Sequence, residues 1–310
     1  MKGPQPVVAG VTACNEERTI GPLLEALLSA RPGGVPIAQV VVVSSACTDQ
    51  TDAIVRGKAR GDGRVELIAE PVRRGKAAAI NVFLAARARR GGVTQGGVTI
   101  VSSADVLPAP GAVEAIVAAF DDPKVGMAGG RPVPSNRGNG LTARMSRLMW
   151  DLHHEAALLA PKLGELVAFR SELVEAIDEA TPVDEALLER EVLAKGYVLR
   201  YVPGAVVSNF GAASLPEWLA QRRRIAAGHH WLEKKYGYRV STAPATLAAR
   251  LMTRAVLPRP DLWLPALALV GVEAAGRTLG RLDAARGRDH AVWKIVARTR
   301  RGAPAGPAPR

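Results

Sequence analysis

The chain has 310 residues, 48% of them hydrophobic, so it can bury a sizeable core and is not a disordered protein. Two cysteines and the lack of an uncharged run of about 18–20 residues argue against a disulfide scaffold and a membrane span. The formal net charge of +12 is uneven, since residues 200–310 hold 19 Lys and Arg against 6 Asp and Glu. Such a basic third is typical of proteins that bind nucleic acid, anionic lipid or phosphate-bearing substrates.

The first hundred residues predict an alternation of strands and helices. Runs rich in Val and Ile, bounded by Gly, Pro, Asn or Ser, predict four strands: Val7–Ala13, Gln39–Val43, Val65–Ala69 and Val98–Val101. Apolar residues at helical spacing between these runs predict three helices: Glu16–Ala30, Asp49–Arg60 and Gly75–Arg89. This order favours a mostly parallel sheet flanked by helices, in which the loops that follow the strands meet at one edge.

Beyond Pro132 the pattern becomes mostly helical. Arg131–Gly140 has the composition of a loop. The later elements that we expect are helices at Leu141–Leu159, Asp184–Lys195 and Leu215–Lys235, and strands at Glu165–Phe169 and Tyr197–Val202, the second of them ended by Pro203-Gly204. Residues 241–300 predict helices broken at Pro258, Pro260 and Pro265, and the Gly/Pro/Ala tail from Gly302 predicts disorder. We therefore divide the chain into residues 1–235, 236–301 and 302–310.

A single carboxylate, Asp105, follows the fourth predicted strand, and two prolines turn the chain directly after it. In open α/β sheets, ligands bind beyond the carboxyl ends of strands, where an acid can hold a divalent cation against a substrate phosphate. Asn15-Glu16-Glu17 and Ser44–Asp49 also follow strands. Helix capping by Asn15 and Asp49 is a sufficient explanation for those two segments taken alone.

Three charged segments lie further along the chain. Lys76 begins a predicted helix, where a cation opposes the helix dipole, so a bound anion such as a diphosphate would explain it. Asp184 and Glu185 also begin a helix, and they fit a dipole complement and a general base for a hydroxyl equally well. Arg224 shares a helix face with Gln221 and suits bidentate phosphate contacts, with a solvated basic face as the alternative.

In this order the segments resemble family 2 glycosyltransferases of the GT-A fold, over residues 6–235. The matching stretches are VTACNEERTIGPLLEALLSA, VVVVSSACTDQTDAIV, VRRGKAAAIN, SSADVLPAP, VDEALLEREVLAKGYVLRYVPGAVV and QRRRI. The resemblance implies a GT-A, Rossmann-like α/β fold: a mostly parallel sheet flanked by helices, with a C-terminal helical extension. It also implies an inverting, metal-dependent transfer of a hexose from a nucleotide diphosphate sugar to a hydroxyl acceptor.

The resemblance also implies roles for single residues. Asp105 would bind Mg²⁺ or Mn²⁺ against the donor diphosphate, and Glu185 or Asp184 would take the proton of the acceptor. The diphosphate or the acceptor would be held by Gln221, Arg224 and His229. The donor would be bound by Thr12, Asn15, Glu16, Ser45, Arg74, Lys76, Asn81, Ala104 and Asp105.

The chain departs from the family pattern at three places. Ser103 replaces the first acid of Asp-x-Asp, which weakens the metal site, and Ser44 and Ser45 replace acids that usually contact the nucleobase. Ile225 replaces a tryptophan of processive synthases, which favours a single transfer over polymerisation. The missing acids also support an alternative, a degenerate GT-A domain that binds a nucleotide or a partner without transferring sugar.

Residues 236–310 lie outside the resemblance. Leu262–Val272, with Trp263 and flanking arginines, favours an interfacial helix on anionic lipid, and a packed helix or a dimer contact is the alternative. No signal peptide is visible, so we expect a cytoplasmic protein at the inner face of the membrane, with a lipid-linked acceptor that serves a cell-envelope glycoconjugate. Only four Phe and four Tyr leave few stacking platforms for nucleic acid, which we do not expect as a partner.

Overall fold

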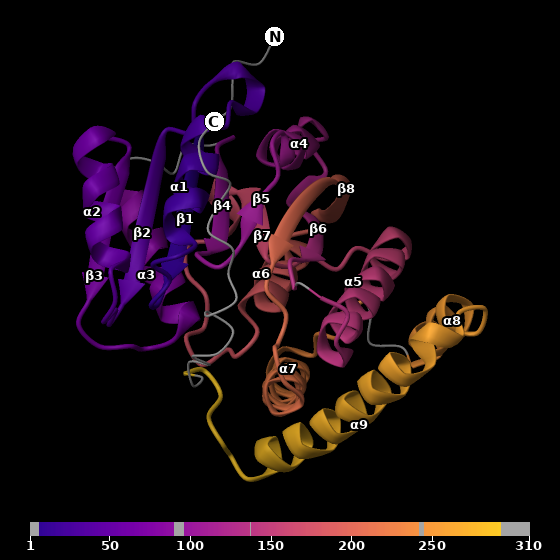
Figure 1. The fold of residues 1–310 in the computed structure, drawn as a ribbon. Helices are drawn as coiled ribbons and strands as arrows, with labels where there is room; N and C mark the ends of the chain where they lie inside the picture. Colours follow the sequence, from indigo (N-terminus) through magenta and orange to yellow (C-terminus); the bar gives the residue numbers. More distant parts are fainter. Residues whose placement is uncertain (1–5, 90–95, 137, 242–244, 293–310) are drawn as a thin grey trace.

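A computed structural model describes residues 6–89, 96–136, 138–241 and 245–292 (Figure 1). In this part of the chain, eight strands form one sheet in the order β3-β2-β1-β4-β7-β6-β8-β5. The first four strands pair in parallel, as the sequence predicts: β1 (Val7–Ala13), β2 (Gln39–Ser45), β3 (Val65–Glu70) and β4 (Val98–Ser103). Helices flank this sheet, so the predicted α/β fold class is confirmed.

Both faces of the parallel strands are buried, which is why these strands are continuous apolar runs. Val40 and Val42 pack in the same core as helix α1 (Ile20–Ser29), whereas Val41 and Val43 pack with helix α3 (Lys76–Arg89) on the other face. Helix α2 (Thr51–Gly61) lies beside α1. The helix predicted from Glu16 begins only at Ile20, because residues 16–19 form a turn that bonds to the loop after β2.

The second half of the sheet contains two strands that the sequence predicts, β7 (Leu166–Arg170) and β8 (Val198–Asn209), and three elements that it does not, β5 (Leu107–Pro108), β6 (Val125–Pro134) and helix α4 (Ala112–Ala118). Strand β7 lies antiparallel between β4 and β6, and β8 is parallel to β6. The two-residue β5 lies at the edge, and helix α4 packs on β8. The short 3₁₀ turns are Pro32–Gly34, Ala119–Asp121, Ser171–Leu173 and Pro260–Leu262.

Two predictions in this half were wrong. The loop expected over Arg131–Gly140 is strand up to Pro134, and the strand expected to end at Pro203-Gly204 continues to Asn209 through an irregularity in its pairing with β6. The glycines of β6 serve close packing rather than turning, since a Cβ on Gly130 would lie 2.3 Å from the Ala205 carbonyl oxygen.

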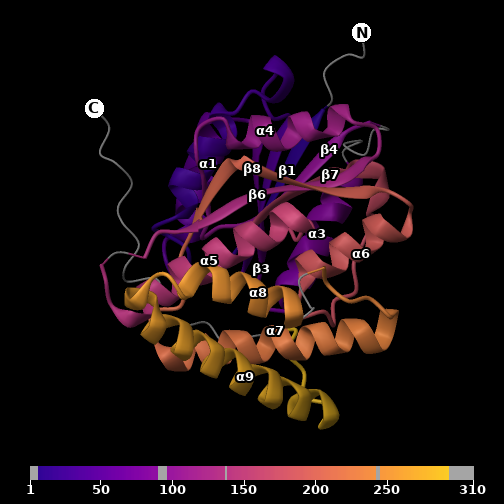
Figure 2. The same cartoon turned by 90° about the vertical axis from the view of Figure 1, so that its right-hand side faces the viewer.

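The C-terminal helices form a layer beyond one edge of the sheet (Figure 2). They follow the prediction closely at α5 (Leu141–Leu159), α6 (Asp184–Ala194) and α7 (Leu215–Tyr236). Two further helices are α8 (Ala245–Val256) and α9 (Trp263–Ala285). Pro265 does not break α9, because a proline is tolerated in the first turn of a helix. The predicted disordered tail lies outside the described residues.

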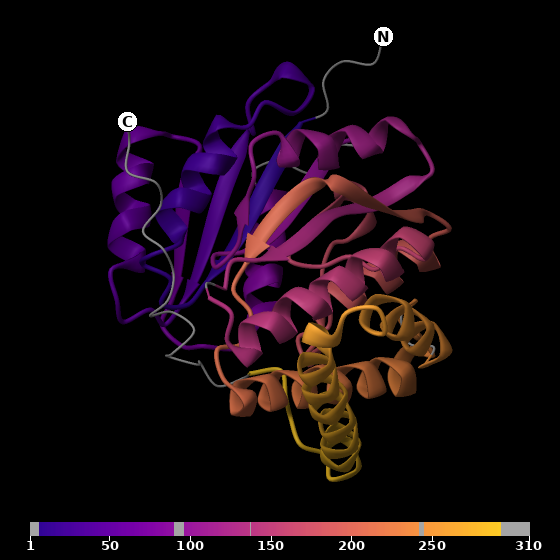
Figure 3. The same cartoon turned by 45° about the vertical axis from the view of Figure 1, so that its right-hand side comes forward.

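Helix α9 crosses α7 on the outside of the molecule (Figure 3). Gly276 and Gly280 let the two backbones approach, since a Cβ on Gly280 would lie 2.7 Å from the Arg223 carbonyl oxygen. By length and composition alone, Pro260–Ala285 is apolar enough to cross a membrane, which the sequence analysis did not expect. In this structure, however, two of its acids pair with arginines of α7.

Candidate active site

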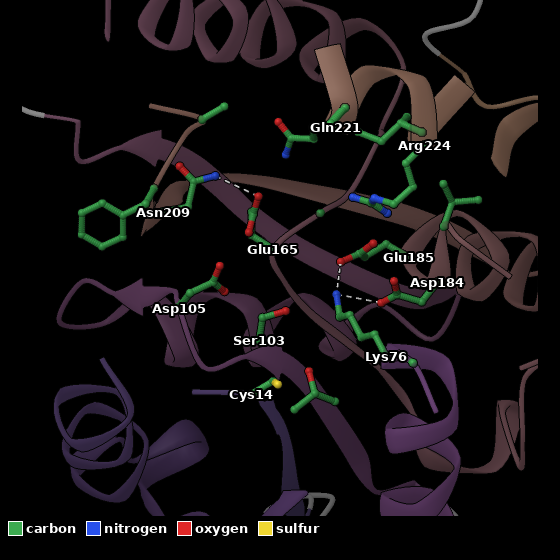
Figure 4. Close-up of a pocket in the computed structure, with 18 of the residues that line it drawn as sticks. Cys14, Lys76, Ser103, Asp105, Glu165, Asp184, Glu185, Asn209, Gln221 and Arg224 are labelled. Atoms are coloured by element: carbon green, nitrogen blue, oxygen red, sulfur yellow. Dashed lines mark hydrogen bonds and ion pairs between the residues drawn. The ribbon is translucent and has the colours of Figure 1, made fainter. Parts of the chain in front are cut away.

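A cavity of about 1390 Å³ opens beyond the carboxyl ends of β1, β2 and β4, under helix α7. Figure 4 shows side chains from β4, α3, α6 and α7 converging on it. Most of the predicted site residues line this cavity: Thr12, Asn15, Glu16, Ser45, Lys76, Ala104, Asp105, Asp184, Glu185, Gln221, Arg224 and His229. Two do not, because Arg74 pairs with Glu70 at 2.7 Å and the amide of Asn81 bonds to the backbone of Ile177.

The loops after β1 and β2 meet, as predicted. Asn15 does not cap the following helix, because its side chain bonds to the loop after β2. Its side-chain Oδ1 accepts from the backbone N–H of Thr48 at 2.7 Å, and its backbone lies in the left-handed region with φ 56°. The backbone N–H of Glu16 donates to Thr51 Oγ1 at 2.7 Å. Asp49 accepts from the N–H of Thr51, at the first residue of α2. These bonds shape the rim of the cavity next to Ser45.

A cation and two carboxylates meet in the cavity, at the starts of α3 and α6. The ammonium Nζ of Lys76 lies 2.6 Å from Glu185 Oε1 and 2.8 Å from Asp184 Oδ2. The cation that opposes the dipole of α3 is therefore compensated by protein acids, and a bound anion is not needed to explain it. Burial opposes the charge on Lys76, but the two acids outweigh burial and raise the pKa of the ammonium.

The same contacts shift the pKa values of the two acids in opposite directions. Burial disfavours ionisation of Glu185, but the Lys76 ammonium outweighs it and lowers the pKa of this carboxyl to about 2. Burial, followed by repulsion from Glu185, raises the pKa of Asp184. The side chain of Glu185 is 25% exposed and that of Asp184 only 4%. Glu185 is thus the ionised acid that a substrate in the cavity can reach.

Asp105 lies on the opposite wall, beside a carboxylate that the sequence analysis missed. Glu165 directly precedes β7, and its Oε1 accepts from Asn209 Nδ2 at 2.8 Å (Figure 4). Burial, and then repulsion from Asp105, raise the pKa of Glu165 to about 7. Nothing in the local sequence distinguishes Glu165, because only the pairing of β7 with β4 brings it here. Among the described residues, no three His, Cys, Asp or Glu side chains form a ready metal site.

Helix α7 covers the cavity from above. Arg222, Arg223 and Arg224 point in three directions, to Glu273, to Asp283 and to the carbonyl oxygen of Pro182. A solvated basic face, the alternative reading of these arginines, is therefore wrong. Burial lowers the pKa of Arg224, which Figure 4 shows above Glu185.

Helix α5 adds an aromatic and histidine wall to the cavity. Trp150 and His153 line the cavity, their rings 5.1 Å apart, and neither Trp150 Nε1 nor His153 Nδ1 has a hydrogen-bond partner among the described residues. Burial, and then the charge of Lys162, lower the pKa of His153 to about 4 and that of His229 to about 3. Both rings, His153 on α5 and His229 on α7, are neutral at physiological pH. The two helices therefore offer the cavity uncharged hydrogen-bonding groups.

The last described residues line the cavity near the start of α3. Helix α9 ends at Ala285, earlier than predicted, and residues 286–292 return toward the start of α3. A Cβ on Gly75 would lie 2.7 Å from the carbonyl oxygen of Ala291, so only glycine fits at this contact. Arg288 and His290 bond to Asp283, which also holds Arg223. The C-terminal segment therefore forms part of the cavity wall.

Two family models match the chain. The model described as "Glycosyl transferase family 2" matches residues 9–173, and "Glycosyl transferase family group 2" matches residues 97–275. The second match reaches 40 residues beyond residue 235, where we expected the resemblance to end. No curated protein sequence matches the chain.

Solved structures share the fold. A mannosyltransferase from Pyrobaculum calidifontis, solved with GDP-mannose and Mn²⁺, is 25% identical, with a TM-score of 0.56 over 92% of this chain and 82% of its own. A mycobacterial protein is 21% identical, with a TM-score of 0.51 over 77% of each chain. Glucosyl-3-phosphoglycerate synthase from Mycobacterium tuberculosis, solved with Mg²⁺ and UDP, is 21% identical, with a TM-score of 0.50 over 77% of this chain and 82% of its own.

Proposed function

The chain belongs to glycosyl transferase family 2, and on that premise we propose that it transfers a single hexose, with inversion, from a nucleotide diphosphate sugar to a hydroxyl acceptor. The observation that carries the proposal is one cavity with Asp105 on one wall and an ionised Glu185, paired with Lys76, on the other. A donor between these walls would have its diphosphate near Asp105 and its sugar toward Glu185.

The oxygen atoms of the protein beside Asp105 are suitable ligands for Mg²⁺ or Mn²⁺. These hard cations prefer carboxylate and carbonyl oxygens, and Asn209 Oδ1 in the same cavity is buried without a hydrogen-bond partner among the described residues. The mannosyltransferase similar to this chain was solved with Mn²⁺ and its nucleotide sugar, which supports the assignment. Such a cation would neutralise charge on the leaving diphosphate. Asp105 is the residue that would hold it.

Glu185 is the residue that we assign as general base. The acceptor oxygen forms a bond to the anomeric carbon, the bond from that carbon to the diphosphate breaks, and the diphosphate leaves with the electron pair. The hydroxyl proton passes to Glu185, which the Lys76 ammonium keeps ionised. Attack from the face opposite the leaving group gives inversion. Asp184, more deeply buried, would orient Lys76.

The remaining lining residues divide between the two substrates. The rim formed by Thr12, Asn15, Glu16 and Ser45 would bind the nucleoside, with Ala104 at the end of β4. Gln221, Arg224 and His229 would contact the diphosphate or the acceptor from α7. We assign no donor contact to Arg74 or Asn81, whose side chains are engaged outside the cavity.

The outer face of α9 supports association with an anionic membrane and a lipid-linked acceptor. Trp263, Leu264, Leu267 and Val270 are all at least half exposed and share one side of the helix. Arg250, Arg254 and Arg259 are exposed on and just after α8, next to this stripe in the chain. An apolar stripe edged by arginines is typical of a helix that lies in a lipid interface. A cytoplasmic enzyme of the cell envelope would meet its acceptor there.

Isothermal titration of the full chain with GDP and with UDP, each with Mn²⁺, tests the donor proposal. We expect one of them to bind with a micromolar dissociation constant and the Asp105→Asn variant to bind at least tenfold more weakly. Folded protein that binds neither nucleotide would contradict the proposal. Binding without turnover of any nucleotide sugar would support the alternative, a degenerate domain.

A further inference from the structure

The end of β4 has one acid where a second would strengthen a cation site. Ser103 offers only a hydroxyl, and Asp105 follows two residues later. Hard divalent cations bind more strongly as the number of charged oxygen ligands increases. A cation held by Asp105 alone would take most of its remaining oxygens from the substrate or from water.

The neighbouring strand brings a carboxylate to the end of β4 that carries Ser103. In the antiparallel pairing of β4 with β7, Val98 pairs with Arg170 and Ser102 with Leu166. Glu165 directly precedes Leu166, and Ser103 directly follows Ser102, so the two residues lie just beyond the last pair of this ladder. Figure 4 shows both of them at the cavity, with Asp105 beside them. The acid that β4 lacks is therefore present directly before β7.

The backbone and one neighbour fix where this acid points. Glu165 has a φ of 66°, a left-handed conformation that is unfavourable for a non-glycine residue. Such residues cluster at functional sites. Asn209 Nδ2 holds one carboxylate oxygen of Glu165 at 2.8 Å, and Figure 4 shows the carboxylate between Asn209 and Asp105. The second oxygen of Glu165 is on the Asp105 side.

The side chain of Asn209 is independent evidence for a ligand site. Its side chain lines the cavity and is only 4% exposed, yet its Oδ1 has no hydrogen-bond partner among the described residues. A buried acceptor left without a hydrogen bond destabilises the folded protein. An amide oxygen is a good ligand for Mg²⁺ or Mn²⁺, whereas an aliphatic or anionic ligand would leave it unsatisfied.

We propose that Glu165 is the second protein carboxylate of the divalent-cation site that Asp105 begins, with Asn209 positioning it. The inference rests on the proposed function for the presence of a cation. It goes further by assigning a ligand that lies 60 residues from Asp105 in the chain and takes the place of the acid absent at Ser103. The cation would join β4 to β7 across the mouth of the cavity.

Titration of the full chain with Mn²⁺ alone tests the role of Glu165 directly. Binding is measured as the loss of the electron paramagnetic resonance signal of the free ion. We expect Glu165→Gln to weaken binding at least tenfold, because it keeps the shape and the bond from Asn209 but removes the charge. Adding Ser103→Asp to that variant should recover most of the affinity. Glu114→Gln is the matched control, since Glu114 lies on α4 and accepts from the backbone of Arg31, outside the cavity.

The outcomes separate this inference from the proposed function. If Asp105→Asn abolishes Mn²⁺ binding and Glu165→Gln, folded by circular dichroism, binds like the wild type, Glu165 is not a ligand and the transferase proposal stands. If the wild type binds no Mn²⁺ but still releases nucleoside diphosphate from a nucleotide sugar, the metal assignment is overturned and the transfer reaction is not. A folded wild type that neither binds Mn²⁺ nor releases nucleoside diphosphate would overturn the metal assignment and the transfer reaction.

Discussion

The contacts of Lys76 dominate the chemistry of the cavity at the scale of single residues. The Lys76 ammonium contacts two carboxylates. It keeps Glu185 ionised, and Asp184 is the more deeply buried of the two acids. A base with a pKa near 2 is a weak proton acceptor in the resting state. Catalysis would therefore benefit if a bound donor diphosphate drew Lys76 away and raised the basicity of Glu185.

Replacing Lys76 by Met should destabilise the protein by about 3 kcal/mol at neutral pH, because it leaves two buried acids without their cation. The folded pKa of Glu185, about 2, lies below its ordinary 4.5, so the stabilisation is present above pH 4.5 and is lost as the pH falls toward 2. Urea unfolding at pH 7 and pH 3.5 checks this prediction. A difference between wild type and variant that did not shrink at the lower pH would contradict it.

The half-buried His153 predicts a loss of stability on acidification as well, but in a higher pH range, near pH 5. Its folded pKa of about 4 lies below the ordinary 6.5, so protons bind the unfolded chain first and stability falls as the pH drops through this window. The loss is up to about 3 kcal/mol. The His153→Gln variant should lose less stability between pH 7 and pH 5 than the wild type, measured by urea unfolding. The exposed His230→Gln serves as control, and an equal loss in His153→Gln and wild type would count against the burial argument.

At the scale of elements, the crossing of α7 and α9 connects the C-terminal extension to the active site. Gly276 and Gly280 meet the backbone of α7 next to Arg222 and Arg223, within the turn that also carries Gln221 and Arg224. A shift of α9 therefore moves residues that line the cavity. This packing argues against treating residues 236–292 as an independent appendage.

Gly280→Ala should lower the free energy of unfolding by about 1–3 kcal/mol, because its Cβ would meet backbone atoms of α7 at 2.7 and 2.8 Å. Gly271→Ala in the same helix is the matched control, since nothing lies within 4 Å of a Cβ there, and it should stabilise by up to about 1 kcal/mol. Thermal unfolding of both variants provides the measurement. Equal effects at the two positions would show that α9 does not pack on α7 in solution.

Elements whose local sequence agrees with their environment could be predicted, and the others could not. The buried Val-rich strands of the first half and the long helices α5 and α7 have clear periodicity. Strand β6 has three glycines and two prolines, a loop composition, and only its packing against β8 explains why it is extended. The same holds for the site: Asp105 follows a recognisable strand, whereas Glu165 reaches the cavity only through long-range pairing.

At the scale of the whole molecule, the basic charge and the apolar face of α9 predict binding to anionic vesicles. Sedimentation with phosphatidylglycerol vesicles should exceed that with phosphatidylcholine and weaken as salt is added. Changing Leu264 and Leu267 to Ser should reduce binding about tenfold or more, because both side chains are about two-thirds or more exposed. Leu159→Ser, equally exposed on α5, is the control. A concentration-dependent dimer without vesicle binding would instead identify the stripe as a dimer contact.

We propose above all that this chain transfers a sugar with Asp105 and Glu185 on opposite sides of the donor. The most direct measurement is the release of nucleoside diphosphate from GDP-mannose, UDP-glucose and other nucleotide sugars by the full chain with Mn²⁺, with and without membrane lipid extract. We predict release from one donor, increased by the extract, and at least a hundredfold slower in Asp105→Asn and in Glu185→Gln. Folded wild-type protein that releases nothing from any donor, or release that persists unchanged in both variants, would contradict the account.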